Sequence, residues 1–149
     1  MKEELKFLGK KTEYEFEYNK DLLDCFENKL VNEILVKLDV IEFTTLCPIT
    51  GQPDYAKIYI SYVPNKLMVE SKSLKLYLNT FRNKGNFHEQ VVDLILNDLK
   101  EKIQPKYIEV YGLFASRGGI SINPFVCYAE PNSIYEEWAI KRKIDYLNV

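Results

Sequence analysis

The chain has 149 residues, of which 46% are hydrophobic and 28% charged, and its formal net charge is -2. These values are typical of one soluble globular domain and exclude a disordered chain or a collagen-like fibre. No apolar run approaches the roughly 20 residues that span a bilayer, and the near-even charge balance leaves no overall positive field for nucleic acid.

The first 33 residues predict a poorly patterned leader segment. Its start, MKEELKFLGKKTEYEFEY, alternates charged and apolar residues and lacks the continuous apolar region of a secretory signal. Residues 22–30 are expected to form at most one or two turns of helix. The chain has three cysteines, an odd number without CxxC spacing, which favours reduced thiols and therefore a cytoplasmic location.

A sharper pattern begins at Ile34. Alternating apolar residues from there predict a strand that runs to Cys47 and is stopped by Pro48. A turn over residues 50–54, rich in glycine and proline, leads into a second alternating run over residues 55–62. We expect these two strands to pair as a hairpin with a connection longer than a tight turn.

Two amphipathic helices are predicted next. In the first, apolar residues recur at helical spacing from Leu74 to Phe81. The other side of this helix carries a basic stripe, which comprises Lys72, Lys75, Asn79 and Arg82. Gly85 is expected to end this helix as its C′ residue. Asn86 is then expected to cap the second helix, with Glu89 as the capping-box acid.

Two further strands are predicted over residues 107–114 and 120–128, and residues 131–149 predict a surface tail with a short helical segment. The order strand, strand, helix, helix, strand, strand predicts an α+β fold, in which two helices cover one face of a four-stranded antiparallel sheet. We therefore expect a single domain over residues 1–149, with a leader over 1–33, a core over 34–130 and the tail.

Cys47 and Asp54 are candidates for chemistry. A cysteine at the end of a strand can present its thiol to a cleft, and the intervening turn can fold Asp54 back toward it. A carboxylic acid in that position can deliver protons to a substrate atom. On the residues alone, a buried structural cysteine and an ordinary turn aspartate are the commoner alternatives.

His88, the only histidine, stands beside Glu89. A carboxylate can accept paired N–H donors from a guanine-like ring, and an imidazole can add a hydrogen bond, although helix capping explains Glu89 equally well. Lys72, Lys75 and Arg82 suit a nucleotide phosphate, or else form a solvated face. No metal site is expected, because one histidine and three scattered cysteines offer too few of the usual ligands.

Together these segments resemble the QueF nitrile reductases, which are the 7-cyano-7-deazaguanine reductases of the queuosine pathway. The matching segments are TLCP (45–48), TGQPD (50–54), ESKSLKLY (70–77) continuing to Arg82, NFHE (86–89) and RGGISI (117–122). They occur in the family's order and spacing over residues 33–130.

The resemblance implies that the Cys47 thiolate adds to the nitrile to give a covalent thioimide, while Asp54 protonates the nitrogen. NADPH is the implied cofactor, and the implied product is 7-aminomethyl-7-deazaguanine. The residues implied in substrate binding are Glu70, Ser71, His88 and Glu89. Those implied in cofactor binding are Lys72, Lys75, Arg82, Arg117 and Gly118. Because a nearby carboxylate raises the pKa of a thiol, we expect a backbone N–H or a cation to offset Asp54.

The resemblance also implies a tunnelling fold, in which subunits join their sheets into a barrel and form a homo-oligomer of two stacked pentamers. Joining the sheets removes the exposed edges of a small sheet. The implied partners are a small deazapurine and further copies of the chain, with no direct nucleic-acid or membrane partner. Two alternatives are a cyclohydrolase-like pterin enzyme, which the shortage of histidine disfavours, and a non-catalytic purine-binding protein.

Overall fold

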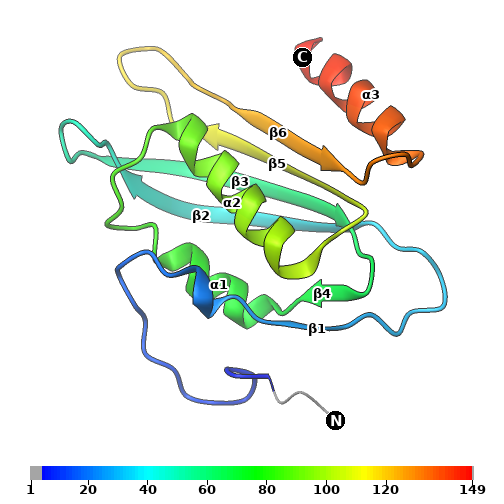
Figure 1. The fold of residues 1–149 in the computed structure, drawn as a ribbon. Coiled ribbons are helices and arrows are strands. Elements are labelled where there is room, and N and C mark those ends of the chain that lie inside the picture. The colour runs from blue at the N-terminus through cyan, green and yellow to red at the C-terminus, as the bar shows by residue number, and fades with distance from the viewer. Residues whose placement is uncertain (1–4, 149) are drawn as a thin grey trace.

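A four-stranded antiparallel sheet with the strand order β2-β3-β5-β6 forms the centre of the computed structural model (Figure 1). The structure describes residues 5–148, so residues 1–4 of the predicted leader and residue 149 of the predicted tail lie outside the described residues. The strands are β2 (Val36–Leu46), β3 (Pro53–Val63), β5 (Tyr107–Phe114) and β6 (Phe125–Ala129). The predicted α+β class and antiparallel sheet are therefore confirmed.

The register between β2 and β3 decides which side chains face the core. The two strands pair antiparallel, and Thr45 lies opposite Asp54. Along β3 every second residue from Asp54 to Tyr62 is buried, as expected for a strand with one covered face. Asp54 therefore continues the row of core residues that includes Ile58 and Ile60, although it is an acid.

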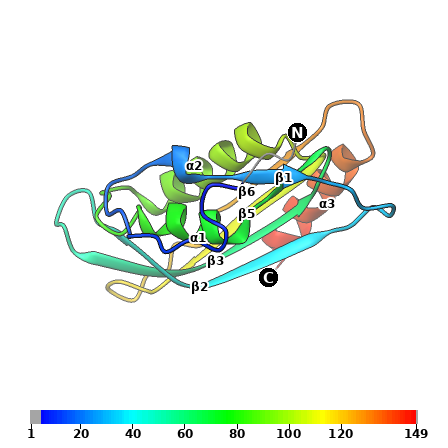
Figure 2. The ribbon, with the colours of Figure 1, turned by 90° about the horizontal axis from the view of Figure 1, so that it is seen from below.

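Two helices cover this buried face of the sheet, and a third lies on the opposite face (Figure 2). They are α1 (Ser71–Asn79), α2 (His88–Ile103) and α3 (Tyr135–Leu147). Tyr77, Phe81 and Ile95 from the helical layer pack with Ile58 and Ile60 of the sheet in one core. Over residues 5–148, no helix is both long enough and apolar enough to cross a bilayer.

The predicted end of the first helix is wrong. Helix α1 ends at Asn79, and Gly85 is not its C′ residue. Gly85 instead forms a parallel bridge with Leu46, and a Cβ atom at Gly85 would lie 3.2 Å from the Cα of Pro48. The glycine is therefore explained by a close approach of two backbone segments rather than by a left-handed cap.

The predicted capping box of the second helix is also wrong. The N-cap residue of α2 is Phe87, whose N–H donates to the side chain of Gln90 at 3.1 Å. The N–H of Asn86 donates to the carbonyl of Leu46 at 3.2 Å, which fixes Asn86 against the end of β2. Glu89 consequently lies in the first turn of α2 without a capping bond and is exposed.

Three other segments differ from the prediction. Residues 22–30 contain no α-helix: η1 (Lys20–Leu22), a 3-10 turn, precedes β1 (Cys25–Glu27), which pairs with β4 (Leu67–Val69). The last strand of the sheet begins at Phe125 rather than at 120, because the loop before it contains two glycines with positive φ and ends in a proline. The tail forms the 13-residue helix α3, which is longer than expected.

Candidate functional site

The β2–β3 hairpin brings Cys47 and Asp54 to one end of the sheet. Cys47 directly follows the last residue of β2, and Asp54 is the second residue of β3. The N–H of Cys47 donates to the carbonyl of Gln52 at 2.8 Å, and the N–H of Gly51 donates to the carbonyl of Cys47 at 3.0 Å. Gly51 has a φ of 70°, which favours glycine. These bonds close the loop around the cysteine and fix its backbone.

His88 approaches Asp54 from the first turn of α2. Its Nε2 atom lies 3.2 Å from Oδ2 of Asp54. The imidazole stacks on the ring of Phe114 in β5, with 4.0 Å between ring centroids and 6° between their planes. The stack leaves the ring little freedom to turn, so the sheet and α2 together hold the imidazole against the carboxylate.

Arg117 approaches the same carboxylate from the loop after β5. One terminal nitrogen lies 3.1 Å from Oδ1 of Asp54, and the other donates to Oε1 of Gln52 at 2.9 Å. Asp54 is only 4% exposed, and a buried carboxylate requires such charged neighbours to remain ionised. Gln52 orients the guanidinium, and the guanidinium compensates the carboxylate.

Several polar atoms at this site are buried but lack hydrogen-bond partners within the described chain. They are Nδ1 of His88 and Oδ1 of Asn86, and both carboxylate oxygens of Asp54, which have only the ion-pair contacts to Arg117 and His88. Folded proteins rarely leave buried polar atoms unpaired, and a cluster of them requires an explanation. Next to a partly exposed cysteine, the cluster favours a site whose remaining partners are supplied by a ligand or a second chain.

The environment of Cys47 favours its thiolate. Hydrogen bonds from the Thr50 hydroxyl, from the backbone N–H groups of Thr50 and Ile49, and from Arg117 lower the pKa of Cys47 from 9.0 to about 6. The same contact raises the pKa of Arg117. Backbone N–H groups and a cation are the donors expected from the sequence, and both kinds contact Cys47 together with the Thr50 hydroxyl. A thiolate at neutral pH is a nucleophile.

The predicted substrate residues do not all meet at Cys47 within one chain. His88 does reach the site, through Asp54, and Glu89 is its neighbour in α2. Glu70 instead caps α1, where its carboxylate accepts the N–H groups of Lys72 and Ser73, both at 2.8 Å. Glu70 is buried by this arrangement, and Ser71 follows it as the first residue of the helix.

The predicted cofactor residues separate into two groups. Lys75 and Arg82 line a hollow of about 540 Å³ between α1 and β2, which we call the α1 hollow, and the predicted substrate residue Ser71 lines it as well. Lys72 is turned to the N-terminal segment, where it donates to backbone carbonyls. Arg117 lies against Asp54, and Gly118 follows it in a turn with a φ of 59°.

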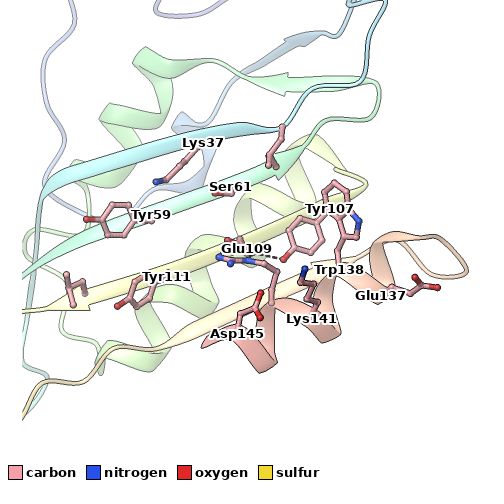
Figure 3. A pocket seen from close by; sticks show the side chains of 13 residues that line it. Lys37, Tyr59, Ser61, Tyr107, Glu109, Tyr111, Glu137, Trp138, Lys141 and Asp145 are labelled. Carbon is pink, nitrogen blue, oxygen red and sulfur yellow. Dashed lines mark hydrogen bonds and ion pairs between the residues drawn. The ribbon is translucent and has the colours of Figure 1, made fainter. Parts of the chain in front are cut away.

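A second hollow, of about 850 Å³, is lined by none of the predicted site residues. It lies between α3 and the opposite face of the sheet (Figure 3). The stacked rings of Tyr59 and Tyr111 line it, and an ion pair of 2.8 Å joins Arg142 of α3 to Glu109. These contacts attach α3 to the sheet, so the hollow is explained by helix packing. No cluster of three or more potential metal ligands occurs within residues 5–148.

Sequence reasoning missed four residues of the site: Thr50, Gln52, Asn86 and Phe114. Thr50 and Gln52 belong to the TGQPD segment, where they were assigned to the turn alone. A short turn directly after a cysteine places N–H and hydroxyl donors near its sulfur, so these residues could have been identified from the sequence. The position of Phe114 under His88 depends on packing between distant segments, which no local pattern reveals.

Comparisons with known proteins support the family resemblance seen in the sequence. A family model described as QueF-like protein matches residues 53–133. An NADPH-dependent 7-cyano-7-deazaguanine reductase from Bacteroides fragilis is 54% identical over 98% of this chain and 97% of its own length. A reductase of the same name from Staphylococcus aureus is 56% identical over 89% of this chain and 81% of its own length.

One solved structure supports the fold. The apo form of an archaeosine synthase QueF-Like matches with a TM-score of 0.60 and 20% identity, over 64% of this chain and 94% of that chain. At this identity the match concerns the architecture alone.

Proposed function

The chain belongs to the QueF-like protein family, and from that premise we propose that it is an NADPH-dependent 7-cyano-7-deazaguanine reductase. The reaction converts the nitrile of the deazapurine into the primary amine of 7-aminomethyl-7-deazaguanine, with two hydrides and two protons consumed. The observation that carries the proposal is a cysteine with a pKa of about 6 in the same site as a buried aspartate.

Cys47 is the nucleophile in this proposal. A nitrile accepts hydride poorly, and addition of the thiolate forms a carbon–sulfur bond that makes the carbon a better electrophile. The donors from Thr50, Ile49 and Arg117 keep the sulfur ionised before the addition. The bond breaks again after the first reduction, when the thiolate leaves and an imine forms. A leaving group of low pKa favours this second step.

Asp54 and His88 carry out the proton transfers in this proposal. The nitrogen of the nitrile takes up a proton when sulfur adds, and Asp54 is the acid assigned to that transfer. Arg117 lies 3.1 Å from one oxygen of Asp54, and after its first proton transfer the carboxyl needs a new proton for the next one. His88 lies 3.2 Å from the other oxygen and is the group that returns a proton to Asp54.

The deazapurine is held by carboxylates and a hydroxyl. Glu89 is exposed in the first turn of α2 and is available to accept the paired N–H donors of a guanine-like edge. Glu70 uses its oxygens to cap α1, yet each retains a further acceptor position, and Ser71 adds a hydroxyl. These two residues belong to the α1 region, so we assign them to the Cys47 site of a neighbouring subunit.

The α1 hollow fits NADPH. Its volume of about 540 Å³ lies within the range of small-molecule sites, and Lys75 and Arg82 offer positive charge for phosphates. Two NADPH molecules, bound one after the other, would each supply one of the hydrides that turn the nitrile carbon into the CH2 of the amine. Arg117 and Gly118 complete the proposed cofactor contacts from the cysteine site, and Lys72 supports the hollow through its bonds to the N-terminal segment.

The tunnelling fold and its barrel belong to this proposal. Strands β2 and β6 are the edges of the sheet, and each has one side without a partner strand in the described chain. Pairing these edges between subunits removes a feature that promotes aggregation. We therefore keep the two stacked pentamers, the site between subunits and the cytoplasmic location as predictions.

A turnover assay tests the proposal. NADPH oxidation is followed together with amine formation, and two NADPH are expected per amine. The Cys47→Ala variant is expected to lose turnover while calorimetry shows retained binding of the deazapurine. A purine-binding protein without catalysis gives no turnover in either form, and that result contradicts the proposal.

A further inference from the structure

The N-terminal segment, defined here as residues 5–19, lies beside α1 and along its basic stripe (Figures 1 and 2). The ammonium group of Lys72 donates to the carbonyl oxygen of Phe7 at 2.6 Å and to that of Lys10. Two of the three donors of this lysine are thus used by backbone carbonyls. Lys72 therefore fixes the N-terminal segment to α1 and is not available as a phosphate ligand.

The same segment contacts the stripe at two further positions. The ammonium of Lys75 lies 5.9 Å from the centroid of the Tyr14 ring, within the range of a cation–π contact. One turn later, the amide of Asn79 donates to the carbonyl of Glu15 at 3.0 Å. Three of the four stripe residues thus meet the segment, which follows the helix closely.

The end of the segment is fixed to the core. The hydroxyl of Tyr18 donates to Asp98 of α2 at 2.6 Å, and its ring packs edge-on against Phe81 at 5.4 Å between centroids. The N–H of Asn19 donates to the hydroxyl of Thr80 at 3.2 Å. The N-terminal segment is consequently fixed to the rest of the fold by contacts both before and after Tyr14 in the sequence.

Tyr14 forms one wall of the α1 hollow, opposite β2. Its side chain is 48% exposed although it lies between two anchored points. The partly exposed ring of Tyr14 and the cations of Lys75 and Arg82 together resemble the lining of a nucleotide site. In such sites a planar heterocycle stacks on an aromatic ring, and cations pair with phosphates. The β2 side of the hollow carries Asp39 and Glu42 against one cation, Lys37, so its net charge is negative and the phosphates belong on the α1 side.

We infer that Tyr14 is the stacking wall of the NADPH site and that Lys72 holds the segment that carries it. The inference rests on the proposed function, since it takes NADPH as the ligand of the α1 hollow. It assigns the N-terminal segment a part in cofactor binding and gives Lys72 and Lys75 different tasks. Lys75 contributes charge to the site, and Lys72 contributes the position of Tyr14.

The test measures NADPH affinity by the fluorescence of the reduced nicotinamide, in the absence of nitrile. Tyr14→Ala is expected to weaken binding about tenfold, the effect of removing one stacking ring, while Tyr14→Phe binds as the wild type does. Phe16→Ala is the matched control, because Phe16 belongs to the same segment and is equally exposed at 48%, yet does not line the hollow. Equal affinity of Tyr14→Ala and wild type overturns the inference.

Two further readouts separate this inference from the proposed function. Tyr14→Ala is expected to raise the KM for NADPH and to leave formation of the nitrile adduct on Cys47 unchanged. A wild-type chain that forms no adduct and binds no NADPH contradicts the proposed function itself. For Lys72, the Lys72→Met variant is expected to increase hydrogen exchange over residues 7–15 and to weaken NADPH binding, and Lys72→Arg restores both. Unchanged exchange and affinity in Lys72→Met contradict its role in fixing the N-terminal segment.

Discussion

Replacing Thr50 by valine removes the donor that contributes most to the low pKa of Cys47. The pKa of about 6 depends first on the Thr50 hydroxyl, then on two backbone N–H groups and Arg117. A hydrogen bond to a charged group accounts for one to two pKa units, so we expect the pKa of Cys47 in Thr50→Val to rise to about 7–8. At pH 6 the thiolate fraction then falls from about half to between about 9% and about 1%, roughly a five- to fiftyfold loss.

Alkylation of the thiol measures this change without any substrate. The rate of iodoacetamide labelling at Cys47 is followed by peptide mass spectrometry from pH 5 to pH 9. Thr50→Ser keeps the hydroxyl and is expected to titrate as the wild type does. Cys127 serves as an internal reference, because burial raises the pKa of its thiol. A Thr50→Val curve that coincides with the wild-type curve refutes the assignment of Thr50 as the main donor.

Three other changes test the site. His88→Phe keeps a ring over Phe114 but removes the nitrogen facing the carboxylate, so turnover should be lost while circular dichroism shows the fold retained; full turnover contradicts the proton path. Gly85→Ala places a Cβ atom 3.2 Å from the Cα of Pro48 and should slow alkylation of Cys47 by shifting its loop; an unchanged rate speaks against that contact. Because folding lowers the pKa of Cys47 from 9.0 to about 6, its contribution to stability should grow as pH rises between these values and vanish below them. Denaturant unfolding of wild type and Cys47→Ala at several pH values checks this difference, and parallel pH profiles contradict it.

Local patterns in the sequence were sufficient for the main strands, whereas the choice of Cys47 and Asp54 as catalytic candidates depends on the resemblance to the family. Strand β5 has the predicted bounds, and β3 differs from its prediction by one or two residues at each end. Alternation along β3 is a local property, and it also decides that Asp54 faces the core. The hairpin then brings Asp54 back toward Cys47 without information from elsewhere in the chain.

Contacts between distant segments account for the errors. The predicted cap at Asn86 failed because its N–H is used by Leu46, a partner that no window around residue 86 contains. Likewise, helical spacing correctly predicted a row of positive charge on α1. The hydrogen bond from Lys72 to the carbonyl of Phe7 was not predictable, because residue 7 lies in a segment that has no regular sequence pattern. Arg117 was assigned to the cofactor from its glycine-rich loop, and only the fold reveals its contact with Asp54.

The covalent adduct is the most direct test of the central claim that Cys47 is a nucleophile toward a nitrile. The folded chain is incubated with 7-cyano-7-deazaguanine in the absence of NADPH and is then examined by denaturing mass spectrometry. We predict a mass increase equal to the intact nitrile, mapped to Cys47 and absent from Cys47→Ala. A folded, oligomeric sample that binds the deazapurine and gains no mass contradicts the account.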